Sequence, residues 1–248
     1  NVMGSVNLLN AVRQCDSIRS LVFITSDKCY ENIDSVWGYR EDDRLGGIDP
    51  YSASKSSAEI VFSSFNRSYF LSKENFGAAS ARAGNVIGGG DWSPNRILPD
   101  CIRAINLNEP IKIRKPNATR PWQHVLEPIS GYLSLGVNLY HNPSAFTGTW
   151  NFGPPTSQVK TVDEVAKMLI KLIGKGSIEI DKSNNYNYEA NMLQLNCDKA
   201  IQLLDWRPRW DINKTLEATV QWYKVFLNEG DIESITKSQL YEYFKDEL

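Results

Sequence analysis

The residues best suited to chemistry are Tyr51 and Lys55, which lie four positions apart in the segment YSASKSSAEIVFSSFNRSYF (51–70). The apolar residues of this segment predict a helix, on which side chains four residues apart lie on one face. An ammonium group close to a phenol favours the phenolate, the form that a general base needs. The pair therefore indicates a proton-abstracting site. A solvated tyrosine and lysine on a surface helix would have the same spacing.

A short strand is expected just upstream of this helix. The run SLVFITS (20–26) is apolar and β-branched, which is typical of a buried parallel strand. Its end is polar, and Ser26, Asp27 and Lys28 follow one another there. Open α/β sheets bind ligands at the carboxyl ends of their strands, so these side chains are candidates for the same site as the tyrosine.

The rest of the chain alternates between helical and extended patterns. Helices are expected at 2–14, 97–107, about 128–141 and 161–174, and strands in 77–91 and 148–155. The helix at 161–174 opens with Thr161 followed by Glu164, the pattern of a capping box. Strands that alternate with helices predict an α/β fold with a parallel sheet.

Composition excludes several classes of protein. The 248 residues are 42% hydrophobic and 23% charged, with a net charge of -2, as in an ordinary globular protein rather than a disordered one. The near-neutral charge argues against nucleic-acid and membrane-surface partners, and no run reaches the ~20 apolar residues of a membrane span. The four cysteines lie far apart and form no C-x-x-C, which favours a cytoplasmic protein without a zinc site.

Five longer motifs carry a family resemblance: TSDKCY (25–30), PYSASKSSAE (50–59), ARAGNVIGGGDW (81–92), TRPWQHVLEP (119–128) and WNFGP (150–154). Together they resemble the extended short-chain dehydrogenases/reductases and, within these, the CDP-glucose 4,6-dehydratases. The resemblance covers most of the chain. It implies a Rossmann-like parallel sheet with a smaller C-terminal α/β lobe that binds the substrate.

The resemblance also implies a division of the chain. Residues 1–90 would form the C-terminal part of an NAD-binding Rossmann domain, and residues 91–248 mainly the nucleotide-sugar lobe, with about 120–145 returning to the Rossmann domain. The glycine-rich turn that receives the pyrophosphate of NAD is absent from the 248 residues. We therefore expect the chain to be an amino-terminally truncated fragment that binds NAD weakly by itself.

The mechanism of the family places five residues in roles. Tyr51 would remove the proton of the C4 hydroxyl of CDP-glucose while hydride leaves for NAD, with Lys55 supporting the phenolate and the nicotinamide ribose. Ser26 would hydrogen-bond the C4 oxygen. Asp27 corresponds to the acid for the departing C6 hydroxyl. Lys28 stands where related dehydratases have a glutamate base at C5, and a lysine acts as a base only where its neutral amine is favoured. Asp27 and Lys28 could instead simply pair with each other.

Substrate binding would use residues further along. Asn85 and Arg120 match positions that face the diphosphate, for which the planar fork of arginine is suited, and Arg96 and Asn151 are weaker candidates for the same cleft. The run 88–90 of three glycines would form a turn beside the substrate. His124 would pack or line the nucleotide pocket rather than catalyse, and Trp206 and Trp210 would belong to the core of the C-terminal lobe.

Alternatives stay open at this point. The chain could act on another nucleotide sugar, as a 4,6-dehydratase or a 4-epimerase, or it could be a catalytically silent binding domain. Asp27 and Lys28 favour dehydration, because a 4-epimerase needs no acid at C6. The resemblance further implies deoxysugar biosynthesis for the lipopolysaccharide O-antigen. It also implies a homo-oligomer, a dimer or tetramer, that pairs the helices at 2–14 and 51–70, whose apolar residues would equally pack within one subunit.

Overall fold

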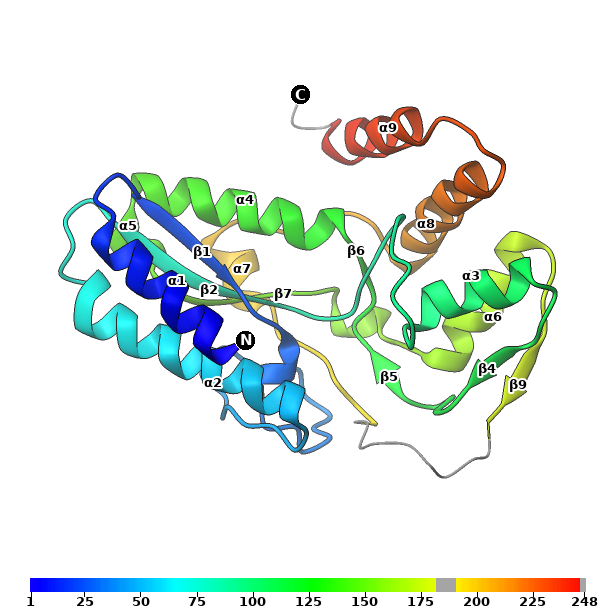
Figure 1. Ribbon diagram of the computed structural model, residues 1–248, viewed down its shortest axis with the longest axis horizontal. Coiled ribbons are helices and arrows are strands. Elements are labelled where there is room, and N and C mark those ends of the chain that lie inside the picture. The colour runs from blue at the N-terminus through cyan, green and yellow to red at the C-terminus, as the bar shows by residue number, and fades with distance from the viewer. Residues whose placement is uncertain (182–190, 246–248) are drawn as a thin grey trace.

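Three parallel strands form the main sheet of the computed structural model, which describes residues 1–181 and 191–245. The strands are β1 (Ser20–Ile24), β2 (Gly77–Ala83) and β7 (Gly148–Phe152), in the order β1-β2-β7. All seven residues of β2 are buried, as its small side chains and central position require. The parallel sheet of an α/β fold is therefore confirmed (Figure 1).

Helices α1 (Val2–Gln14) and α2 (Pro50–Phe65) lie against one face of the sheet (Figure 1). Asp49 caps α2 by accepting hydrogen bonds from the backbone of Tyr51 at 2.9 Å and Ser52 at 3.0 Å. The helix continues into one π turn, Asn66–Phe70. The core on this face includes the rings of Phe23 and Phe62, which stack with centroids 5.3 Å apart.

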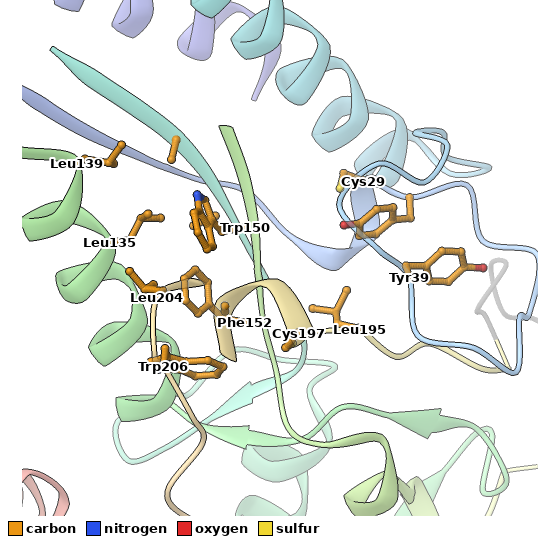
Figure 2. Packing of buried hydrophobic residues seen from close by; sticks show 14 of the residues in the cluster. Cys29, Tyr39, Leu135, Leu139, Trp150, Phe152, Leu195, Cys197, Leu204 and Trp206 are labelled. Carbon is orange, nitrogen blue, oxygen red and sulfur yellow. The ribbon is translucent and has the colours of Figure 1, made fainter. Parts of the chain in front are cut away.

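The opposite face is covered by α4 (Leu126–His141), with α5 (Pro143–Phe146) and α7 (Asp198–Leu203) beside it (Figure 1). Figure 2 shows Leu135, Trp150 and Phe152 packed together in this core. A β-carbon on Gly131 of α4 would come within 2.4 Å of the Phe152 ring, so the close approach of α4 to β7 requires glycine there. Trp206 also belongs to this core, so its expected place in the core of the C-terminal lobe is wrong.

A second lobe forms beyond the carboxyl ends of the strands. It contains α3 (Ile97–Asn106), α6 (Val162–Ile173), α8 (Ile212–Leu227) and the parallel pair β4 (Ile111–Ile113) and β9 (Ile178–Ile180). These elements share one apolar core, which includes Ile111, Leu169 and Leu216. The predicted capping box is confirmed, because Thr161 and Glu164 each accept a hydrogen bond from the other's backbone N–H, at 3.1 and 2.8 Å.

Short elements join the two parts. Strand β3 (Val86–Ile87) pairs in parallel with β6 (Gln123–His124), and β5 (Thr119–Arg120) pairs antiparallel with β8 (Lys160–Thr161). Two 3₁₀ turns, η1 (Asp27–Cys29) and η3 (Thr156–Gln158), follow β1 and β7, and α9 (Ile232–Phe244) closes the described chain. In residues 1–181 and 191–245, we find no helix long and apolar enough to cross a membrane. The four cysteines are free thiols.

Candidate active site

A cleft of about 880 Å³ opens at the carboxyl ends of β1 and β2, with the second lobe as its other wall. Seven of the nine site residues expected from the sequence line it: Ser26, Asp27, Lys28, Tyr51, Asn85, Arg96 and Arg120. They come from segments up to 94 positions apart, taking residue 120 minus residue 26. The fold therefore brings the phenol, the polar strand end and the expected phosphate-binding groups to one place.

Tyr51 lies in the first turn of α2, and 52% of its surface is exposed. The ammonium of Lys55 lies 5.9 Å from the centre of the Tyr51 ring, one turn further along the helix. Lys55 does not itself line the cleft. The two groups share one face of α2, as their spacing predicts, and the phenol is the member that a bound molecule in the cleft would meet.

The end of β1 forms a compact polar turn. The hydroxyl of Ser26 accepts a hydrogen bond from the backbone of Lys28 at 3.2 Å and donates one to Oδ1 of Asp27 at 3.0 Å. Asp27 is 3% exposed, and its Oδ2 has no hydrogen-bond partner among the described residues. Burial raises the pKa of this carboxyl, against the opposing effects of Lys28, Ser26 and Arg120. A carboxyl that keeps its proton to higher pH can act as a proton donor.

The cleft is rich in cationic side chains, which come from both walls. Asn85 lies just after β2. Arg120 is 4% exposed, and its Nη1 donates a hydrogen bond to the carbonyl of Thr119 at 2.8 Å. Arg96 pairs with Asp91 at 3.0 Å. Seven basic groups line the cleft against five acidic ones, and the basic ones are Lys28, Arg96, Arg103, Lys112, Arg114, Lys115 and Arg120. This excess of positive charge suits an anionic ligand.

Asn151 has a different role from the one expected. It is completely buried in β7 and does not line the cleft. Its amide accepts a hydrogen bond from the Tyr30 hydroxyl at 2.8 Å and donates to the carbonyls of Tyr39 and Asn196 at 2.9 and 3.1 Å. These bonds use the amide inside the protein, so the expectation that Asn151 binds substrate is corrected.

His124 packs, as expected, but it does not line the cleft. The ring is 2% exposed and lies 4.7 Å from the ring of Trp210, centre to centre. Burial, with a smaller effect of the Lys214 charge, lowers the pKa of His124 to about 4. The imidazole is therefore neutral near pH 7 and is a packing group.

The sequence reasoning missed a buried ion pair behind the cleft. The guanidinium of Arg82 lies 2.8 Å from the carboxylate of Glu59, and the two side chains are 3% and 2% exposed. Glu59 is on α2, eight positions after Tyr51, and Arg82 is the one charged residue of β2. The sequence contained one sign of this pair, the single charge of Arg82 among the small residues of the strand. A buried charge requires a partner of opposite charge, so this arginine could have predicted the ion pair.

The fold and the site define a Rossmann-fold protein of the short-chain dehydrogenase/reductase class. Residues 1–219 match the family model described as GDP-mannose 4,6 dehydratase, and the chain belongs to this family. The CDP-glucose 4,6-dehydratase of Salmonella typhimurium is 44% identical over 247 residues, which cover 98% of this chain and 69% of that protein.

Solved structures share the fold. A dTDP-glucose 4,6-dehydratase from Bacillus anthracis, in complex with NAD, superimposes with a TM-score of 0.75 at 24% identity, over 90% of this chain and 67% of that one. A UDP-glucuronic acid 4-epimerase from Bacillus cereus, in complex with UDP-glucuronic acid and NAD, gives a TM-score of 0.77 at 19% identity, over 91% and 67%. Because both dehydratases and epimerases have this fold, the fold alone does not separate the two reactions.

Proposed function

We propose that the protein is an NAD-dependent CDP-glucose 4,6-dehydratase, which converts CDP-D-glucose to CDP-4-keto-6-deoxy-D-glucose and water. The observation that carries the proposal is the meeting of Tyr51, Ser26 and Asp27 in one cleft that also holds an excess of basic groups. The 44% identity to the Salmonella enzyme supports the choice of CDP-glucose.

NAD fits the donor set at the carboxyl end of the sheet. The ammonium of Lys55 and the exposed phenol of Tyr51 are suited to hold the ribose next to the nicotinamide, and Ser26 lies at the neighbouring strand end. When bound, the cofactor supplies a reversible hydride acceptor, which takes the hydride from C4 and returns it to C6. The 248 residues contain no G-x-G-x-x-G turn, and we propose that this chain alone binds NAD weakly.

The residues of the chain would handle the protons. Tyr51 takes the proton of the C4 hydroxyl as C4 becomes a ketone, and Ser26 hydrogen-bonds the same oxygen. The ketone makes the C5 proton acidic. Lys28, the group at the position of the C5 base, would take this proton and return it to C5 when hydride adds at C6. Asp27 gives its proton to the C6 hydroxyl, which leaves as water. The raised pKa of Asp27 supports this assignment, because a donor must still hold its proton near neutral pH.

The diphosphate of the substrate would bind to basic and amide side chains that line the cleft. We propose that Arg120 and Asn85 bind the phosphate oxygens and that Arg96, at the start of α3, assists. A buried arginine such as Arg120 is well suited to this, because charge-assisted hydrogen bonds strengthen where water is excluded.

We further propose a homo-oligomer in the cytoplasm that acts in deoxysugar synthesis for the lipopolysaccharide O-antigen. Exposed apolar residues on α1 and α2, including Met3, Leu8 and Ile60, support a helix-to-helix interface between subunits. The four free thiols support a reducing compartment.

The test is a competition assay with the protein expressed from the complete gene. It is incubated with NAD and with CDP-, dTDP-, UDP- and GDP-glucose, and mass spectrometry records which nucleotide sugar loses one water. We expect loss from CDP-glucose, reduced about 10²- to 10⁴-fold by Tyr51→Phe. The matched control is Tyr69→Phe, which removes another exposed phenol outside the cleft and should leave turnover unchanged.

Other outcomes would replace the proposal. Loss of water from a different nucleotide sugar would reassign the substrate. A product that is isomerised and keeps its C6 hydroxyl would identify a 4-epimerase. Binding of CDP-glucose without turnover by the folded, NAD-loaded protein would leave a sugar-nucleotide-binding protein.

A further inference from the structure

We propose that Glu59 is a positioning residue of the active site: it fixes helix α2, which carries Tyr51, against the end of strand β1, which carries Ser26. The inference rests on the proposed function, because it concerns the alignment of these two groups on one substrate oxygen.

The carboxylate of Glu59 is bonded on both of its oxygens. Oε1 accepts a hydrogen bond from the hydroxyl of Thr25, the residue directly before Ser26. Oε2 accepts hydrogen bonds from the Ser80 hydroxyl at 2.9 Å and from Nη2 of Arg82 at 2.8 Å. One side chain of α2 is thus joined to the end of β1 and to the middle of β2.

Arg82 extends the connection beyond the sheet. Its Nη1 donates to the Tyr30 hydroxyl at 2.8 Å and to the backbone carbonyl of Glu41 at 3.0 Å. The Tyr30 hydroxyl in turn donates to Asn151 of β7 at 2.8 Å. The Glu59 carboxylate therefore belongs to a network that joins α2, the turn after β1, and strands β2 and β7.

The placement of this network suits positioning more than stability. A buried ion pair is costly to desolvate, and apolar residues of similar volume often give an equally stable fold. Charged hydrogen bonds instead fix the relative position of the elements that they join, because each bond sets a distance and an angle. Glu59 lies on the same helix as Tyr51 and Lys55, at intervals of four residues. It is therefore well placed to fix the distance between the phenol and the Ser26 hydroxyl.

Alignment of this kind has a kinetic signature. The phenol and the Ser26 hydroxyl must reach the same C4 oxygen, and a displacement of about 1 Å can cost on the order of 100-fold in rate. Substrate affinity would change little, since the diphosphate is assigned to other side chains, Arg120 and Asn85. A misaligned enzyme should therefore have a lower kcat with a similar KM, and breaking of the C4–H bond should limit the rate more strongly.

The experiment uses Thr25→Val in the protein expressed from the complete gene, because this change removes the hydroxyl that joins Glu59 to β1 and keeps the side-chain shape. We expect kcat to fall about 10-fold or more, KM to stay within about 3-fold, and the isotope effect with C4-deuterated CDP-glucose to rise. Thr25→Ser retains the hydroxyl and should restore both values. Thr219→Val is the matched control, since it removes a buried hydroxyl whose hydrogen bond, in the part of the chain that the structure describes, is to the Thr215 carbonyl within α8.

The outcomes separate the two proposals. If the wild-type protein turns over CDP-glucose and Thr25→Val has the wild-type kcat and isotope effect, the positioning role is overturned and the function stands. If Thr25→Val lowers the melting temperature but leaves kcat per folded enzyme unchanged, the positioning role is also overturned, because the network then contributes only to stability. Absence of turnover of all four nucleotide sugars by the wild-type protein overturns both proposals.

Discussion

A β-carbon on Gly89 would lie 2.1 Å from the indole ring of Trp222, because the glycine-rich turn passes directly under helix α8. The same turn is held by the hydroxyl of Tyr223, which donates to the carbonyl of Asp91 at 2.5 Å. Asp91 pairs with Arg96, and both line the cleft. Helix α8 therefore fixes the loop that forms one wall of the site, although α8 itself does not line it.

This contact predicts that Gly89→Ala lowers the free energy of unfolding by about 1–3 kcal/mol, because the new methyl group overpacks the turn. Trp222→Ala in the same chain should remove the clash, so the double variant should be less destabilised than the sum of the single variants. Urea unfolding measures this coupling. The control is Gly4→Ala, since nothing lies within 4 Å of that position on α1. Additive effects at Gly89 and Trp222 would contradict the prediction.

Asp27→Asn should reduce dehydration by about 10²- to 10⁴-fold while the protein becomes more stable. Burial raises the folded-state pKa of Asp27, so the unfolded state loses its proton at a lower pH than the folded state. The resulting loss of stability begins at the ordinary pKa of 3.8, grows as pH rises to the folded-state pKa, and disappears as pH falls back to the ordinary value. The gain in melting temperature should therefore be largest at neutral pH and should shrink in acid. Turnover assays and thermal unfolding check both parts. An asparagine variant with more than a tenth of the activity would exclude Asp27 as the acid.

Arg120→Met should raise the KM for CDP-glucose by about 10- to 100-fold, which corresponds to the loss of a charged hydrogen bond to phosphate. The expected change in kcat is smaller, because the role proposed for Arg120 is to bind the diphosphate and not to move a proton. Steady-state kinetics at several substrate concentrations separate the two constants. Arg207→Met, at an exposed position outside the cleft, is the control for loss of one positive charge. An unchanged KM would place the diphosphate elsewhere.

His124 should make the fold sensitive to acid. Its pKa is about 4 in the folded protein and about 6.5 when unfolded, so the unfolded state binds a proton first as pH falls. Its contribution to stability is complete above about pH 6.5 and decreases through the window down to about pH 4, by about 2 kcal/mol between pH 7 and pH 5. Urea unfolding of the wild type and of His124→Gln, compared at several pH values, isolates the contribution of His124 to the free energy of unfolding. All other titrating groups are the same in the two proteins. Parallel pH profiles would refute it.

Local pattern was enough to predict the main helices and strands of this protein up to residue 174. The parallel strands, the helix that carries Tyr51 and Lys55, and the Thr161 capping box all follow from apolar periodicity and residue type within short windows. The cleft was also predictable in outline, since polar residues after parallel strands meet at one edge of the sheet. Ser26, Asp27, Lys28 and Asn85 lie there for that reason.

The tertiary structure decided what each remaining polar or aromatic side chain does. Asn151 and Trp206 have the residue types of a binding group and a lobe core, yet the fold uses the first within a buried network and the second in the core beside the sheet. Glu59 and Arg82 are 23 positions apart, and Gly89 and Trp222 are 133 apart, taking the differences of their numbers. Such pairs depend on how distant segments pack, and a periodicity confined to one segment contains no information about its partner.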